Sequence, residues 1–118
     1  MHTAARVLIA VVALLHVWFF VLESLLWQAP LGRKTLAMSA EQAGATAVLA
    51  KNQGVYNLFL AAGLVWALTS GALFAPLAIF FLGCVVVAGV VGAITAKPII
   101  LFVQAVPAGL ALAAVFLS

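Results

Sequence analysis

The sequence has 118 residues, of which 69% are hydrophobic and 6% are charged, and its formal net charge is +3. Soluble globular proteins carry about a quarter charged residues, so this composition argues against a water-soluble domain. It predicts one membrane-embedded domain over residues 1–118. The basic residues form no continuous run, which argues against a nucleic-acid partner.

The chain contains one cysteine, Cys84, which excludes an internal disulfide and a metal site built from several thiolates. The sequence also lacks a phosphate-binding loop, a dinucleotide-binding glycine fingerprint and a nucleophile elbow. We therefore predict no cofactor, no metal and no catalytic residue.

The first predicted membrane span covers residues 5–27, which contain no proline or glycine. A spanning helix needs about 20 apolar residues. The apolar stretch is long for a signal peptide, and no small-residue cleavage site follows it. Pro30 disfavours helix in the residue before it, so the helix is expected to end after Trp27.

The one polar segment covers residues 28–52. Pro30 to Lys34 are interpreted as a turn, because proline and glycine favour turns. Ser39 and Gln42 fit a capping box, in which the two side chains satisfy each other's backbone N–H groups. The alanine-rich residues 40–49 predict a short extra helix that runs on into the second span.

The remaining spans are predicted at residues 51–70, 77–96 and 99–117. Residues 71–76 form a tight uncharged connection, and Lys97-Pro98 interrupts the apolar sequence between the last two spans. Short connections force neighbouring helices to be antiparallel. The predicted fold class is therefore all-α: a transmembrane bundle of four helices, with a short extra helix in the first cytoplasmic connection.

The third and fourth spans carry small residues at helical spacing, which let helix backbones approach closely in lipid. These pairs and triplets are Ala88 with Gly92, Gly89 with Ala93, and Ala105 with Gly109 and Ala113. The pattern predicts tight packing, either inside one bundle or between protomers of a homo-oligomer.

The basic residues predict the orientation. Arg33, Lys34, Lys51 and Lys97 flank the first and third connections, and Arg6 lies near the start of the chain. Cytoplasmic loops are enriched in lysine and arginine. Both connections are therefore expected in the cytoplasm and both termini outside, in a bacterial inner membrane.

Polar side chains inside predicted spans are expensive and need a reason. Counted from the cytoplasmic ends, three spans bring such residues to one layer: Glu23, Asn52, Gln53, Tyr56, Asn57 and Gln104. The layer is either a structural hydrogen-bond network or a small pocket centred on Glu23. A further alternative is that Lys51 or Lys97 neutralises Glu23 in an ion pair.

Three further residues belong to the predicted site or its border: His16, Trp27 and Arg33. His16 lies seven residues before Glu23, so the two share a helix face about 10 Å apart along the axis. It is expected to be a packing residue, with a functional role as the alternative. Trp27 and Arg33 are expected at the membrane interface.

Two motifs resemble a known family. The first is LESLLW at residues 22–27, followed by Pro30 and the GRK triplet at residues 32–34. The second is LAKNQGVYNLFLA at residues 49–61. Together they resemble the bacterial membrane family called domain of unknown function 1304. The resemblance covers nearly the whole chain and implies the motif residues Glu23, Trp27, Asn52, Gln53, Tyr56 and Asn57, without implying a reaction.

Three functions are compatible with the sequence. The first is binding or transport of a small molecule or proton through the polar layer, in contact with the lipid bilayer. The second is a non-catalytic scaffold that modulates a partner. The third is a membrane enzyme acting on a lipophilic substrate, which would require Arg33 to fold over a pocket containing Tyr56 and Asn57.

Overall fold

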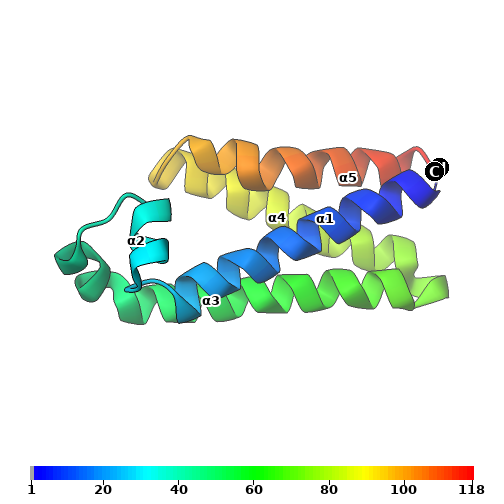
Figure 1. Ribbon diagram of the computed structural model, residues 1–118. Helices are drawn as coiled ribbons and strands as arrows, with labels where there is room; N and C mark the ends of the chain where they lie inside the picture. The colour runs from blue at the N-terminus through cyan, green and yellow to red at the C-terminus, as the bar shows by residue number, and fades with distance from the viewer. Residues whose placement is uncertain (1) are drawn as a thin grey trace. The chain divides into compact units, whose positions relative to one another are not determined.

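The computed structural model describes residues 2–118, which form helices and no strand. This confirms the predicted all-helical class. The elements in chain order are α1 (His2–Phe20), the π-helical turn η1 (Val21–Leu25), α2 (Pro30–Thr35), α3 (Ala40–Thr69), the 3-10 turn η2 (Gly71–Leu73), α4 (Phe74–Thr95), the π-helical turn η3 (Leu101–Ala105) and α5 (Val106–Phe116) (Figure 1).

The described chain divides into two compact units, each considered by itself. The first unit contains residues 2–14 and 60–118, and the second contains residues 15–59. In the first unit, α5 packs along α4 (Figure 1). The second unit contains η1, α2 and the first part of α3, where the candidate site lies.

Two helical segments are long and apolar enough to cross a membrane. They are Thr3–Leu25, with 23 residues, and Gly71–Thr95, with 25 residues. Leu101–Phe116 is a shorter apolar helix. The predicted span at residues 51–70 lies in α3, which begins at Ala40 as one uninterrupted helix of 30 residues.

The first helix ends earlier than predicted, at Leu25. The N–H of Leu26 donates to the carbonyl of Val21 at 3.0 Å, five residues back, so the helix closes in a π turn. The turn predicted from Pro30 to Lys34 is wrong, because these residues lie in α2. Proline is favoured at the first position of a helix, where its missing N–H would have had no partner.

The capping box at the start of α3 is confirmed. The Ser39 N–H donates to Gln42 Oε1 at 3.0 Å, and the Gln42 N–H donates to Ser39 Oγ at 3.1 Å. Both bonds satisfy N–H groups that a helix start leaves unpaired. The helix predicted at residues 40–49 therefore begins as expected and continues directly into the second apolar segment.

The last predicted span is broken into two kinds of helix. Pro107 follows η3 and cannot donate a backbone hydrogen bond to the preceding turn. The N–H of Val106 donates instead to the carbonyl of Leu101, five residues back. The wider π turn thus accommodates the proline, and α5 continues from Val106.

The core of the first unit is apolar, and Ile9, Leu64 and Leu82 are fully buried in it. Arg6 lies beside this core. Its Nη1 donates to the carbonyl of Leu68 at 2.9 Å, and its guanidinium carbon lies 4.4 Å from the centre of the Phe74 ring. Arg6 therefore satisfies a carbonyl in the last turn of α3, where helices leave such groups unpaired.

Close backbone packing joins α4 to η3 within the first unit. A Cβ atom added at Gly89 would lie 2.7 Å from the Ala105 nitrogen and 2.8 Å from its Cβ. These two small residues were among those predicted to allow close approach. Their contact lies inside one chain, whereas a Cβ at Gly109 would meet nothing within 4 Å.

The end of α2 is a Schellman motif with an alanine where glycine is usual. The Met38 N–H donates to the carbonyl of Arg33 at 2.9 Å, and the Ala37 N–H donates to the carbonyl of Lys34 at 3.3 Å. Ala37 has φ = 54°, in the left-handed region. This conformation costs an L-residue roughly 1–2 kcal/mol.

We expect Ala37→Gly to raise the free energy of unfolding by roughly 1 kcal/mol, because glycine adopts this conformation without a steric cost. The measurement is unfolding of detergent-purified protein in a denaturing detergent, followed by circular dichroism. Ala45→Gly is the control: Ala45 is exposed inside α3, and glycine there should cost about 1 kcal/mol. Destabilisation by both changes would contradict the prediction.

Candidate functional site

The candidate site is centred on Glu23, a half-buried carboxyl in the π turn η1. Asn57, on α3, is 4% exposed, and its Nδ2 donates to Glu23 Oε1. Depth along the helices predicts these two residues in one layer, and the structure brings them into direct contact.

Small residues on α3 allow this contact. The face of α3 that carries Asn57 also carries Ala43, Ala50 and Gly54, all buried. A Cβ atom added at Gly54 would lie 2.1 Å from Ser24 Oγ, so only glycine leaves room for Ser24 here. The backbone of α3 thus comes close enough to η1 for Asn57 to reach Glu23.

Two further hydrogen bonds hold the end of the first helix against α3. Ser24 Oγ donates to the carbonyl oxygen of Lys51 at 2.9 Å. Trp27 Nε1 donates to Thr46 Oγ1 at 2.9 Å, and this hydroxyl donates to the carbonyl of Gln42 at 2.8 Å. Each polar side chain therefore has a defined partner on α3, which fixes the position of Glu23 between them.

A polar cleft of about 200 Å³ opens beside Glu23. Its lining residues are Glu23, Ser24, Leu25, Trp27, Gln28, Ala29, Ala47 and Lys51. Asn57 engages only Oε1 of Glu23. Among residues 2–118, Glu23 Oε2 has no hydrogen-bond partner, and it is not fully buried. This second oxygen therefore retains some exposure, and Glu23 itself lines the cleft.

Lys51 does not form the ion pair with Glu23 that was one of the predicted alternatives. Lys51 lines the same cleft as Glu23, but no ion pair joins the two side chains within the part of the chain that the structure describes. The cleft thus has a carboxyl and an ammonium group that are not neutralising each other. Such an arrangement can bind a small polar molecule that carries complementary groups.

The other predicted polar residues of α3 face away from Glu23. Asn52, Gln53 and Tyr56 are exposed, and Tyr56 packs edge-to-face on Phe59 at 6.0 Å between ring centres. The buried face of α3 is set by its small residues. Of the four predicted polar residues on α3, Asn57 is the buried one that contacts Glu23.

The remaining predicted residues lie apart from the cleft lining. His16 is fully buried and packs edge-to-face on Phe19, with ring centres 5.1 Å apart. Gln104 belongs to the first unit, where it lies half-buried in η3. Arg33 lies on α2, and its Nε is buried without a hydrogen-bond partner among the described residues. The pocket that the enzyme hypothesis required, with Arg33 over Tyr56 and Asn57, is not this cleft.

Sequence reasoning missed the contributions of Ser24 and Gln28 to the cleft, and at this site it considered Lys51 only as an ion-pair partner of Glu23. A signal was present, because Lys51, Gly54 and Asn57 recur every three residues and so share one face of a helix. A glycine between two polar residues on that face indicates a close helix contact.

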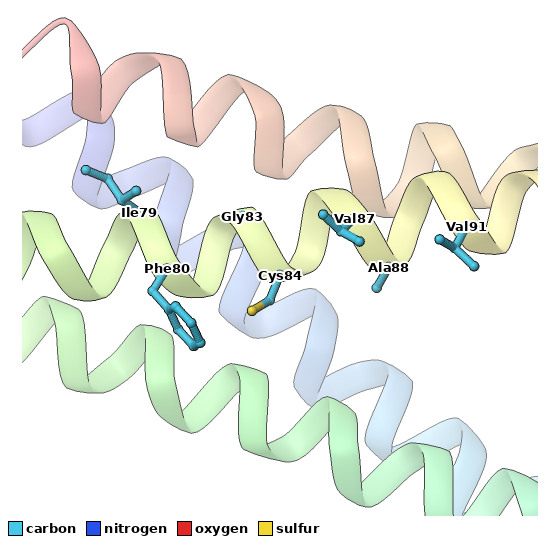
Figure 2. A pocket seen from close by; sticks show the side chains of 7 residues that line it. All are labelled: Ile79, Phe80, Gly83, Cys84, Val87, Ala88 and Val91. Carbon is cyan, nitrogen blue, oxygen red and sulfur yellow. The ribbon is translucent and has the colours of Figure 1, made fainter.

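A larger groove of about 650 Å³ runs along α4 and is apolar except for one thiol (Figure 2). Its lining residues are Ile79, Phe80, Gly83, Cys84, Val87, Ala88 and Val91. These side chains offer neither charge nor hydrogen-bond partners for a polar ligand. Elsewhere, no group of three His, Cys, Asp or Glu side chains that could hold a metal comes together within residues 2–118.

The fold and the site define an all-helical protein with very apolar helices and a polar cleft built on a half-buried carboxyl. The chain belongs to the family described as protein of unknown function DUF1304, whose family model matches residues 10–116. This confirms the resemblance seen in the two motifs. Comparisons with curated proteins and with solved structures find no match.

Proposed function

We propose that this chain is an integral membrane protein of the bacterial inner membrane, with four spans, that binds a small molecule in the cleft beside Glu23. The support for membrane insertion is the length and composition of Thr3–Leu25 and Gly71–Thr95. In this proposal the apolar end of α3 and the η3–α5 segment supply the other two spans. The apolar groove of α4 then faces lipid.

The observation that supports binding is that only one of the two Glu23 carboxyl oxygens is hydrogen-bonded. A carboxyl inside an apolar helix is costly and is kept where it has a function. A purely structural carboxyl would have both oxygens engaged and no adjoining space. Here Asn57 fixes one oxygen, and the other is not fully buried, beside a cleft of about 200 Å³. Asn57 orients the group, and Glu23 is the residue that receives the ligand.

The proposed layer extends beyond the cleft. Asn52, Gln53 and Tyr56, which are exposed on α3, would form the cytoplasmic mouth, and His16 would continue the polar path along the first span. Transport of a small molecule or proton would follow this path. The Glu23–Asn57 hydrogen bond also favours a second candidate, a scaffold in which the pair only fixes helix packing.

A binding assay separates the two candidates. The protein is expected to stay in the membrane fraction after an alkaline carbonate wash, and is then purified in detergent. Thermal unfolding is measured with a panel of small primary and quaternary amines. We expect at least one amine to raise the midpoint in the wild type and in Glu41→Gln, but not in Glu23→Gln. Glu41 is the matched control, because it is exposed at the start of α3 and is the one other acidic residue.

Two results would count against binding at Glu23. One is stabilisation by amines that Glu23→Gln retains. The other is no stabilisation by any amine, together with a Glu23→Gln protein that unfolds more easily than the wild type. The second result would establish Glu23 as a structural residue and favour the scaffold.

The orientation is tested by fusions to the C-terminus. Because basic residues flank the first and third connections, both termini are expected outside the cytoplasm. A C-terminal alkaline phosphatase fusion should therefore be active, and a C-terminal green fluorescent protein fusion should be dark. Fluorescence without phosphatase activity would reverse the orientation and move the cleft to the outer face.

A further inference from the structure

The cleft beside Glu23 is lined by one acidic and one basic residue that form no ion pair with each other. Glu23 and Lys51 both line it, and Asn57 engages only one of the two Glu23 oxygens. A carboxylate and an ammonium group that reach into one small space attract each other. A ligand that carries both complementary charges can occupy the space between them and pair with each.

The positions of both groups are fixed by contacts outside the cleft. Asn57 holds Oε1 of Glu23, and Ser24 Oγ binds the backbone carbonyl of Lys51 at 2.9 Å. Gly54 keeps the two helices close at this point, since any larger residue would collide with Ser24. The carboxyl and the Lys51 backbone are therefore held at a set separation before any ligand arrives.

The rest of the lining suits an ammonium group near Glu23. Trp27 lines the cleft, and its one polar atom, Nε1, is already bonded to Thr46. The indole thus contributes mainly aromatic surface, which attracts cations. Gln28 also lines the cleft, and its side-chain amide can donate and accept hydrogen bonds.

The volume limits the size of the ligand. A space of about 200 Å³ is smaller than the roughly 300–1,000 Å³ that pockets for drug-sized ligands usually have. This suits a small molecule with an amine and an acid group separated by a few bonds. Lysine is also a common partner for phosphate groups.

We propose that the cleft binds a small zwitterion of the phosphoethanolamine type, with its ammonium at Glu23 and Trp27 and its acid group at Lys51. This inference rests on the proposed function, since it names the ligand class of the same site. The same chemistry is available from a free metabolite and from the headgroup of a membrane lipid.

The test compares three soluble probes by calorimetry with detergent-purified protein: phosphoethanolamine, ethanolamine and inorganic phosphate. We expect phosphoethanolamine to bind about tenfold more tightly than either of the others, because it makes both charged contacts. Lys51→Gln should lower its affinity about tenfold, whereas ethanolamine should bind at least as tightly as to the wild type, because a neighbouring like charge is removed. Lys34→Gln is the control, since Lys34 is exposed on α2 and does not line the cleft.

The outcomes separate this inference from the proposed function. Ethanolamine binding as tight as phosphoethanolamine binding, still dependent on Glu23, would overturn the zwitterion and leave the proposed function standing. So would a Lys51→Gln protein with unchanged phosphoethanolamine affinity. If no probe bound in a manner that required Glu23, both would fall.

The two sources are distinguished in nanodiscs. Phosphoethanolamine binding is measured in discs of phosphatidylglycerol alone and in discs that also contain phosphatidylethanolamine. Loss of soluble-probe binding in the mixed discs would identify the lipid headgroup as the ligand, and retained binding would identify a free zwitterion. Both results support a zwitterion site.

Discussion

Gly89→Ala is expected to lower the free energy of unfolding by roughly 1–3 kcal/mol, the range for overpacking a tight contact. The added methyl would lie 2.7 Å from the Ala105 nitrogen and 3.0 Å from its Cα. These are backbone atoms and cannot rotate away, so α4 and η3 must separate. The loss of close packing then extends along both helices.

Gly83→Ala is the matched control, in the same helix and with the same change. A Cβ atom at Gly83 meets nothing within 4 Å. Alanine is a better helix former than glycine, so Gly83→Ala should be neutral or stabilising by up to about 1 kcal/mol. Unfolding in mixed micelles, followed by circular dichroism, measures both. Equal effects of the two changes would mean that α4 and η3 do not pack at Gly89.

The second large effect is expected from Asn57→Leu. This change keeps the side-chain size but leaves the half-buried Glu23 carboxyl without its hydrogen-bond donor. Orphaning a polar group of this kind costs about 1–3 kcal/mol. Glu23→Leu in the same protein should restore part of the loss, since both positions are then apolar. The coupling energy between the two positions is expected to be about 1–2 kcal/mol.

The four proteins of this double-mutant cycle are compared by the same unfolding assay. Asn52→Leu provides the control, because Asn52 lies on the same helix but is exposed. It should change stability by less than about 0.5 kcal/mol. Additive effects of Glu23→Leu and Asn57→Leu would show that the two side chains do not depend on each other.

Local rules predicted the helical class and the helix start at Ser39 well. The capping box depends only on residues three apart, so the sequence contains all the information that it needs. The same kind of rule failed at Pro30, because proline favours both turns and first helical positions. The outcome there depends on tertiary contact: a Cβ at Gly32 would lie 1.8 Å from the carbonyl oxygen of Leu26, so α2 packs directly on the preceding turn.

The site was predicted in part. Depth along the spans was enough to group Glu23 with Asn57, because each lies a few residues from the end of its apolar segment. Depth does not give the face of a helix, however, and Tyr56 next to Asn57 points elsewhere. The face is decided by where the backbones come closest, at Gly54 and Ser24, which no count along one helix can reveal.

The π turns change how a helical wheel applies to this chain. A residue added to one turn rotates everything after it by about 100° relative to an unbroken α-helix. A wheel drawn through residues 5–27 is therefore out of phase within η1, so the shared helix face expected for His16 and Glu23 is lost in this turn. Glu23 lies in η1 and Gln104 in η3. Both polar side chains thus lie in a π turn. Each can therefore point in a direction that the pattern of apolar residues in the neighbouring α-helix does not predict.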